Sequence, residues 1–325
     1  MEINELSHPD SIWVYKGSRR GEKVSIWIPY LHEIKKEKAK NTYLVSYRGG
    51  EFSMDLSKVD CIMVYGPVGN LPVSFLDALG NNRIPLLIHR RNLANPYYFL
   101  PARRADEKDM LTRQVLCREN QVKRAYIART IIRERIKTLS AFIPPQNGAL
   151  IKLNGSRSIP QIRSIEAQCA KEYWKSYYVK CGFSGISRRD NERPVNQALN
   201  ACSVFMAGIF LRWALLHRLA PTHGFLHEPS SYIALIYDLM EPVRWWMEAA
   251  VFEAVSQATD EKKYTPYALE NLKKMMDVVV YVPVTRQTVR RKSVAHGLVL
   301  ALRAYLMGDM RRLVLPAEGK QEAGR

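Results

Sequence analysis

Residues 106–142 read DEKDMLTRQVLCRENQVKRAYIARTIIRERIKTLSAF, a run that contains neither glycine nor proline. Apolar side chains recur along it at helical spacing. The acids Asp106, Glu107 and Asp109 stand at its start, where the helix dipole favours negative charge. We therefore predict a long helix here, and we place a domain boundary at its beginning.

The residues before this helix have the pattern of β-strands. Short β-branched and aromatic stretches are separated by turn signals such as the RGG at residues 48–50. Alternation at Val24, Ile26 and Ile28 indicates a strand with one buried face. The predicted strands cover residues 12–15, 24–28, 42–47, 62–65 and 85–89, with a short helix at residues 73–79.

The residues after position 142 have mostly helical patterns, with one ambiguous stretch at residues 278–284. The predicted helices cover residues 164–180, 195–219, 231–258, 265–277 and 285–307. The sequence thus predicts an α+β protein. A small N-terminal β-rich domain (residues 1–104) precedes a larger all-α domain (residues 105–317), and residues 318–325 form a disordered tail.

The composition is that of an ordinary globular protein with an unusual charge. Of the 325 residues, 47% are hydrophobic and 25% are charged, which excludes disordered and collagen-like chains. There are 49 Lys and Arg against 31 Asp and Glu, so the formal net charge is +18. Such a field attracts polyanions, and nucleic acid is therefore the expected partner.

The cysteines and the longest apolar run indicate the cellular location of the protein. Five scattered cysteines without a C-x-x-C pair favour a reducing environment, so we expect a cytoplasmic protein. The apolar run at residues 199–220 is interrupted by Asn200, Arg212 and His217. We therefore predict no membrane span.

The segment that indicates chemistry is residues 222–246, THGFLHEPSSYIALIYDLMEPVRWW. Asp238 and Glu241 lie three residues apart inside an apolar run, which places two carboxylates on one side of a helix. Pro242 cannot donate a hydrogen bond to the carbonyl of Asp238, so the helix must kink or restart beside the acids. Acids in apolar surroundings are unfavourable unless a cation or a function compensates them.

Two further residues complete a candidate metal site. Glu166 borders an apolar and aromatic helical stripe, and His227 lies on the turn before the predicted helix at residues 231–258. Oxygen ligands with one imidazole suit Mg²⁺ or Mn²⁺ better than zinc. From the residues alone, a solvated acid pair and a capping histidine remain open alternatives.

Three segments resemble the CRISPR adaptation integrase family, Cas protein number one. They are GFLHEPSSYIALIYDLMEPVRWW (residues 224–246), IEAQCAKEYW (residues 165–174) and RRDNERPVNQALNACSVFMAG (residues 188–208). The resemblance covers most of the chain. It implies that Glu166, His227 and Glu241 bind metal, that Asp238 is a further catalytic residue, and that Arg244 contacts DNA.

The resemblance also implies an activity and partners. The expected reaction is metal-dependent phosphoryl transfer with Mg²⁺ or Mn²⁺, in which the 3′-hydroxyl ends of short DNA fragments (spacers) are joined to a CRISPR repeat array in antiviral defence. The same centre would act as an endonuclease. The implied assembly is a homodimer, built through the N-terminal domain, that joins the small CRISPR adaptation subunit in a heterohexamer.

Two alternatives and a set of DNA contacts remain open at this point. The alternatives are a transposon-encoded integrase of the same fold and a non-catalytic DNA-binding scaffold. By charge alone, a basic DNA-binding surface is predicted from six further side chains: Arg129, Arg133, Arg286, Arg290, Arg291 and Lys292.

Overall fold

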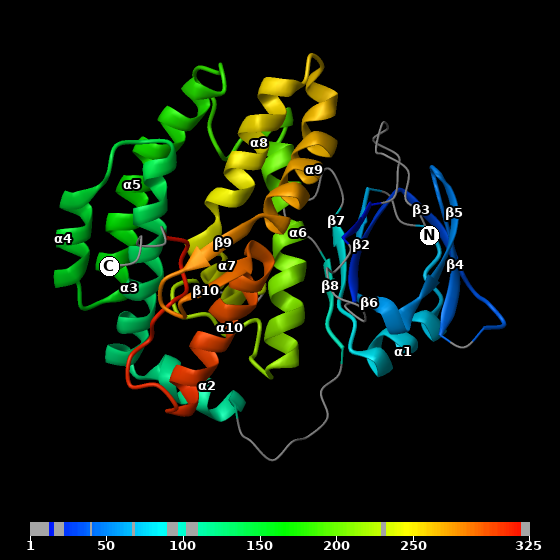
Figure 1. Ribbon diagram of the computed structural model, residues 1–325, viewed down its shortest axis with the longest axis horizontal. Helices are drawn as coiled ribbons and strands as arrows, with labels where there is room; N and C mark the ends of the chain where they lie inside the picture. Colours follow the sequence, from blue (N-terminus) through cyan, green and yellow to red (C-terminus); the bar gives the residue numbers. More distant parts are fainter. Residues whose placement is uncertain are drawn as a thin grey trace. The chain divides into compact units, whose positions relative to one another are not determined.

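The computed structural model describes residues 13–15, 23–39, 41–66, 69–89, 97–101, 110–228 and 232–319. The chain divides into two compact units (Figure 1). The first consists of residues 1–105 with residues 200–212, and the second of residues 106–199 with residues 213–325. A β-rich N-terminal part followed by a mostly helical part confirms the predicted fold class.

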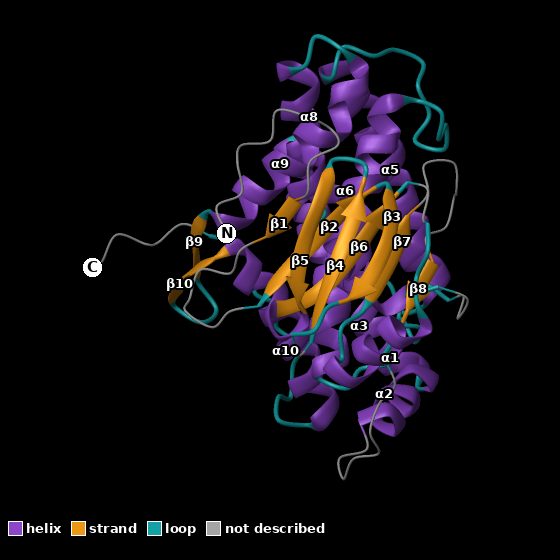
Figure 2. Ribbon diagram, turned by 90° about the vertical axis from the view of Figure 1, so that its right-hand side faces the viewer, coloured by secondary structure: helices purple, strands orange, loops and turns teal. Residues whose placement is uncertain are grey.

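The first unit contains two sheets, which face the viewer in Figure 2. One has the strand order β1-β2-β6-β7-β8 and the other β3-β4-β5. In the first sheet β2, β6 and β7 are parallel, while the edge strands β1 and β8 are antiparallel to their neighbours. The elements are β1 (Trp13–Tyr15), β2 (Val24–Pro29), β3 (Leu31–Lys36), β4 (Thr42–Tyr47), β5 (Gly50–Asp55), η1 (Leu56–Lys58), β6 (Val59–Tyr65), α1 (Val73–Asn82), β7 (Leu86–His89) and β8 (Tyr97–Phe99).

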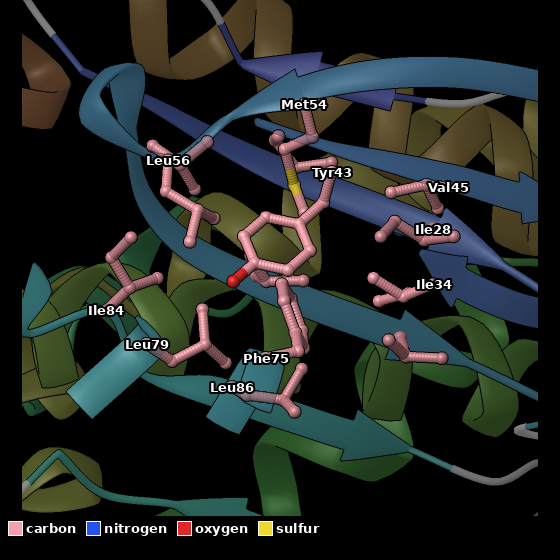
Figure 3. Packing of buried hydrophobic residues seen from close by; sticks show 14 of the residues in the cluster. Ile28, Ile34, Tyr43, Val45, Met54, Leu56, Phe75, Leu79, Ile84 and Leu86 are labelled. Atoms are coloured by element: carbon pink, nitrogen blue, oxygen red, sulfur yellow. The ribbon is translucent and has the colours of Figure 1, made fainter. Parts of the chain in front are cut away.

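Aliphatic and aromatic side chains from both sheets and from α1 form the core of this unit (Figure 3). Ile28 and Val45 are completely buried, and so is Phe75 of α1. The ring of Phe75 meets that of Tyr43 edge to face, with 5.0 Å between centroids. The alternation that predicted the strand at residues 24–28 therefore points Ile26 and Ile28 into this cluster.

The second unit is mostly helical. Its elements are α2 (Met110–Glu119), α3 (Gln121–Thr138), η2 (Leu139–Ala141), α4 (Asn147–Gly155), α5 (Ile159–Lys180), α6 (Pro194–Leu216), α7 (Ala234–Met240), η3 (Glu241–Val243), α8 (Trp245–Gln257), η4 (Glu261–Lys263), α9 (Tyr264–Asp277), β9 (Val279–Val282), β10 (Gln287–Arg290) and α10 (Arg291–Met307). Residues 200–212 of α6 belong to the first unit.

The helix predicted over residues 106–142 is interrupted, so the prediction of one continuous helix was wrong. Asn120 has an extended backbone, and its side chain accepts a hydrogen bond from the amide of Lys123 (3.0 Å). This N-cap ends α2 and starts α3. The acids predicted to start the helix, at residues 106–109, lie outside the described residues.

The helix predicted over residues 231–258 restarts where Pro242 was expected to disturb it. α7 ends at Met240, η3 includes Pro242, and α8 begins at Trp245. Residues 229–231, at the predicted start of this helix, lie outside the described residues.

The C-terminal region differs from the prediction in two places. The helix expected from residue 285 begins only at Arg291, because residues 287–290 form β10, which pairs with β9. Arg286, at the turn between these strands, has a positive φ of 53°. The predicted disordered tail begins with ordered residues: Glu318 accepts hydrogen bonds from the side chains of Trp246 and Arg291 (2.8 Å each). Residues 320–325 lie outside the described residues.

One helix of the described chain, α6, is long and apolar enough to cross a membrane. Of its most apolar 18-residue segment, 67% is buried inside the protein, as is usual for a core helix. All five cysteines are buried free thiols.

Candidate active site

The turn at residues 222–228 is wrapped around the carboxylate of Asp238. Oδ2 accepts hydrogen bonds from the amides of Phe225 (2.5 Å) and Leu226 (3.0 Å). Oδ1 accepts from the amide of His227 (3.1 Å) and lies 2.6 Å from its ring Nδ1. Because Asp238 is completely buried, these four contacts compensate its lost hydration.

The carbonyl groups of the same turn are bonded by side chains of α2 and α3. Gln114 donates to the carbonyl of His223 (2.8 Å), and Arg118 donates to that of Gly224 (2.9 Å). Arg124 donates to the carbonyl of Phe225 (2.9 Å). With amides and carbonyls both held, the turn is preorganised and fixes the position of His227.

The glycine of this turn is required by close packing. A β-carbon at Gly224 would lie 2.9 Å from Asp238 Oδ2 and 2.9 Å from the carbonyl oxygen of His227. Any side chain would therefore push the turn away from the carboxylate. This explains why the sequence has glycine three residues before the histidine.

Asp238 orients His227 and changes its protonation. Burial lowers the pKa of the imidazole, but the hydrogen bond and charge of Asp238, together with Glu241, outweigh this effect and raise it above 6.5. Since Nδ1 faces the carboxylate, Nε2 is the nitrogen that remains for another ligand. A carboxylate behind a histidine is the arrangement that supports metal-binding imidazoles. We therefore interpret Asp238 as a positioning residue that acts through His227.

Glu241 is buried at the start of η3 and is only partly paired. Arg244 donates to its Oε1 (2.7 Å). Its Oε2 has no hydrogen-bond partner among the described residues, and it lies 3.6 Å from Nε of Arg135. Burial raises the pKa of this carboxyl, but Arg244, Arg135 and His227 outweigh burial and lower it. Glu241 is therefore an ionised group with one oxygen available for a ligand.

Glu166 lies on α5, half-buried, in the electrostatic field of the same residues. Burial raises its pKa, and the charge of Glu241 raises it further, against the opposite effects of Arg244 and His227. α5 and η3, which carry Glu166 and Glu241, both pack against α3. The turn that carries His227 is held by Arg124 of α3 and Asp238 of α7. The structure thus brings the three predicted ligands into one electrostatic cluster.

The types of donor atom in this cluster suit a hard divalent ion. It offers two carboxylates and one imidazole nitrogen, and Oε2 of Glu241, which accepts no hydrogen bond, is a buried oxygen that a cation would satisfy. No three His, Cys, Asp or Glu side chains of the described chain stand close enough to hold an ion as they lie. Instead, guanidinium groups face Glu241, so metal binding requires a rearrangement of these side chains.

Sequence reasoning missed a buried ion pair behind Glu241. Arg135 of α3 and Glu248 of α8 form two parallel hydrogen bonds (2.9 and 2.6 Å). The hydroxyl of Tyr173 donates to Glu248 Oε2 (2.6 Å), and the Tyr173 ring lies 5.0 Å from the Arg135 guanidinium. This network fixes Arg135 beside Glu241. The sequence does contain a signal for this pair, because Arg135 and Glu248 each lie on an apolar face of their helix.

Most of the predicted DNA contacts have structural partners. Arg129 donates to the carbonyl of Ser156 (2.8 Å) and Arg133 to the side chain of Asn154 (2.9 Å), so both hold the end of α4. Arg286 stands at the turn between β9 and β10. DNA contact by these side chains stays a prediction.

The remaining basic residues of the set pair with acids. Arg290 donates to Asp277 (3.2 Å), and Lys292 lies 3.9 Å from the same carboxylate. Arg291 donates to Glu318 (2.8 Å). These pairs hold the β9–β10 hairpin, α9 and the C-terminal segment together, and DNA contact here also stays a prediction.

The sequence is similar to known proteins over most of its length. The family model described as CRISPR associated protein Cas1 matches residues 30–271. A relative named CRISPR-associated endonuclease Cas1, from Korarchaeum cryptofilum, is 29% identical over 172 residues, which are 50% of this chain and 45% of the relative. The matched segments span between 44% and 66% of the curated relatives' own lengths, so the chain spans only part of them.

Solved structures share the fold at low sequence identity. A Cas1 protein from Thermotoga maritima has a TM-score of 0.74 at 18% identity, over 91% of this chain and all of the other. A casposase bound to its integration product has a TM-score of 0.73 at 20% identity, over 90% and 92% of the two chains. A chain of a Cas6-RT-Cas1–Cas2 complex has a TM-score of 0.76 at 11% identity, over 92% of this chain and 37% of that one. Because the family model covers well over half of the sequence, this chain belongs to the CRISPR-associated Cas1 family.

Proposed function

We propose that this chain is a metal-dependent DNA integrase and endonuclease of CRISPR adaptation. It joins the 3′-hydroxyl ends of short DNA fragments to a repeat array by phosphoryl transfer. The observation that carries the proposal is the His227–Asp238 pair, held by a preorganised turn beside the half-satisfied carboxylate of Glu241. Family membership supports the reaction class.

Glu166, His227 and Glu241 would hold Mg²⁺ or Mn²⁺, which suits their oxygen-rich donor set. Such an ion, when bound, supplies charge neutralisation at the phosphate that reacts. Asp238 keeps the imidazole of His227 in one orientation, with Nδ1 engaged and Nε2 presented. Release of Glu241 Oε1 from Arg244 would free the guanidinium for a phosphate oxygen of the DNA.

His227 has an alternative role in the same reaction, as an acid–base group. With its pKa above 6.5, the ring can hold or release a proton near neutral pH. It could then take the proton from the attacking 3′-hydroxyl instead of binding the ion. The pH dependence of joining in Asp238→Asn tests the protonation state of this ring.

The proposed partners follow from charge and from the structural relatives. A formal net charge of +18 supports DNA as the substrate. The similarity to a chain of a Cas6-RT-Cas1–Cas2 complex supports the small adaptation subunit as a partner. We further propose that the chain forms a homodimer and binds this subunit in a heterohexamer. We place this assembly in the cytoplasm, because five buried free thiols suit a reducing compartment.

A strand-joining assay tests the proposal, with a short duplex, a repeat-bearing plasmid and Mg²⁺ or Mn²⁺. We expect Glu166→Gln and His227→Ala to abolish joining and to leave duplex binding intact. The matched controls are Glu172→Gln, an exposed acid on the same helix, and His223→Ala on the same turn, and both should join normally. Joining that persists in the first two variants, or in chelator, would support a non-catalytic scaffold instead.

A transposon-encoded integrase is the second candidate, because a casposase is among the structures that share the fold. The shared fold at 20% identity does not separate the two functions. Their targets differ, so the assay should compare a plasmid with a repeat array against one without. Preferential joining at the border of the repeat supports the adaptation integrase, and equal joining to both plasmids supports the transposon enzyme.

A further inference from the structure

The segment after α10, residues 308–319, is bound to other parts of the helical unit at several points (red, after α10, in Figure 1). Leu313 is buried, and its amide donates to the hydroxyl of Tyr126 on α3 (3.0 Å). The amide of Gly319 donates to a carbonyl of β9 (3.0 Å). These anchors fix the path of the segment and place Glu318 beside the last of them.

Glu318 holds two side chains from this position. Its Oε1 accepts hydrogen bonds from Nε1 of Trp246 and from Nε of Arg291, each 2.8 Å long. Trp246 lies in the first turn of α8 and is completely buried, and the guanidinium of Arg291 lies 5.0 Å from the ring centre of Trp245. One carboxylate oxygen thus joins the start of α8 to the start of α10.

The start of α8 is weakly held by its own backbone. Pro242 of η3 has no amide proton, and the helix restarts after it. The amides of Arg244 and Glu248 donate to carbonyls one turn back at 3.4 Å each, which is longer than an ordinary backbone hydrogen bond. Contacts with neighbouring elements therefore contribute more than usual to the position of this turn.

The two sides of this turn have different environments. Arg244 pairs with Glu241 (2.7 Å) and lies 3.6 Å from Glu248, so this side of the helix faces the candidate active site. Trp246 follows two residues later, about 200° around the helix axis, and therefore lies on the opposite side. Glu318 thus binds the turn from the side opposite to Arg244.

We propose that Glu318 is a positioning residue of the candidate active site. Through Trp246 it fixes the first turn of α8, and this sets the position of Glu241 and Arg244. The inference rests on the proposed function, which makes Glu241 a metal ligand. A ligand must be held within about 0.5 Å of its productive position, so loosening of this turn weakens metal binding.

The test is Mn²⁺ affinity, measured by electron paramagnetic resonance on the full chain. We expect Glu318→Ala to bind Mn²⁺ roughly tenfold more weakly than the wild type, as is usual when a group that supports a ligand is lost. Glu318→Gln keeps an oxygen that accepts from Trp246, and it should restore most of the affinity. Glu253→Ala is the matched control, because Glu253 is an exposed acid on α8 itself, and its affinity should not change.

A second variant tests whether Glu318 acts through the indole. Trp246→Phe removes the hydrogen-bond donor and keeps an aromatic ring in the buried position. If Glu318 acts through Trp246, the two losses of affinity are not additive, and Glu318→Ala/Trp246→Phe binds Mn²⁺ as weakly as Glu318→Ala alone. Additive losses would overturn the inference.

Thermal unfolding is measured separately, because a purely structural role would also lower stability. A Glu318→Ala protein that unfolds at a lower temperature but binds Mn²⁺ with wild-type affinity would overturn the inference. If Glu318→Ala does not fold, Trp246→Phe decides, because it removes the same hydrogen bond. Wild-type Mn²⁺ affinity in Trp246→Phe would then have the same meaning.

Failure of this inference is distinguishable from failure of the proposed function. If the wild-type protein binds Mn²⁺ and joins DNA, and Glu318→Ala does both equally well, only the role of Glu318 is wrong. If the wild-type protein does neither, the proposed function is wrong. The backbone amide resonances of residues 241–246 then still report whether the first turn of α8 moves in Glu318→Ala, and unchanged resonances would overturn the inference as well.

Discussion

The buried cluster of the first unit is built from aliphatic and aromatic side chains, whereas the interior of the second unit encloses charged ones. Ile28, Val45 and Phe75 represent the first kind of interior (Figure 3). Arg135 and Glu248 represent the second, with exposed fractions of 6% and 0%. Apolar burial stabilises a fold directly, while buried charges are unfavourable unless they are paired. The first unit also buries an acid, Asp60, which pairs with Arg212 (2.7 Å), so the difference lies in the number of buried charges beside the candidate site.

The largest expected effect is removal of one partner of the buried ion pair. Glu248→Ala leaves Arg135 buried without its two hydrogen bonds and should reduce the free energy of unfolding by about 4 kcal/mol. Chemical denaturation followed by circular dichroism measures this. The double variant Arg135→Met/Glu248→Leu is the control, and it should recover much of the stability. If Glu248→Ala unfolds at the wild-type denaturant concentration, the pair is not essential to this interior.

The next effect concerns the carboxylate that orients the histidine. Asp238→Asn keeps the shape of the side chain but removes the charge that faces His227 Nδ1. We expect joining to fall about a hundredfold, as is usual when the group behind a ligand is replaced. Initial rates of strand joining at saturating metal provide the measurement. An unchanged rate would show that the orientation of His227 is fixed by the turn alone.

The pH dependence of strand joining tests how Asp238 changes the protonation of His227. Nε2 of His227 must be unprotonated to act, so joining should rise with pH, with a midpoint above 6.5 because Asp238 and Glu241 raise this pKa. In Asp238→Asn the midpoint should move to lower pH. The raised pKa also means that protonated His227 stabilises the fold fully below pH 6.5, and that this contribution is lost as pH rises through the folded-state pKa. If the midpoint of joining moves to higher pH in Asp238→Asn, Asp238 does not raise the pKa of His227.

The smallest effect is expected in the apolar interior. Ile28→Val removes one methylene from a completely buried position and should reduce the free energy of unfolding by about 1 kcal/mol. The pH profile of joining should not change, because no titratable group is altered. Denaturation and the joining assay on the same preparation test both expectations. A shift in the pH profile would show that packing in the first unit influences the protonation of His227.

The sequence predicted local features better than long-range ones. The strand at residues 42–47 and the restart at Pro242 were confirmed, because alternation and a missing amide act within a few residues. The break between α2 and α3 was missed, since Asn120 as an N-cap does not disturb the apolar spacing around it. The strand β10 was read as helix because a short strand is defined by its partner β9, not by its own pattern.

The candidate site could be predicted only in part for the same reason. Asp238 and Glu241 stood out as acids in an apolar run, Glu166 and His227 were added from their local patterns, and the family resemblance implied the role of each. The sequence suggested one shared helical side for the two acids, yet Asp238 binds the turn at residues 224–227 and Glu241 faces Arg244. The two acids differ in role because only Asp238 accepts hydrogen bonds from the backbone amides of residues 225–227, which lie outside the helix.

The ion pair of Arg135 and Glu248 joins residues 113 positions apart. A single sequence offers no means of pairing two charges at that distance, although each lies on an apolar helix face.

The central claim is that Glu166, His227 and Glu241 hold one divalent ion. Titration of Mn²⁺ followed by electron paramagnetic resonance tests it without reference to activity. We expect the wild-type protein and Glu172→Gln to bind one ion per chain, and Glu166→Gln and His227→Ala to bind none over the same range. Equal Mn²⁺ binding by all four proteins would contradict the assignment of this site.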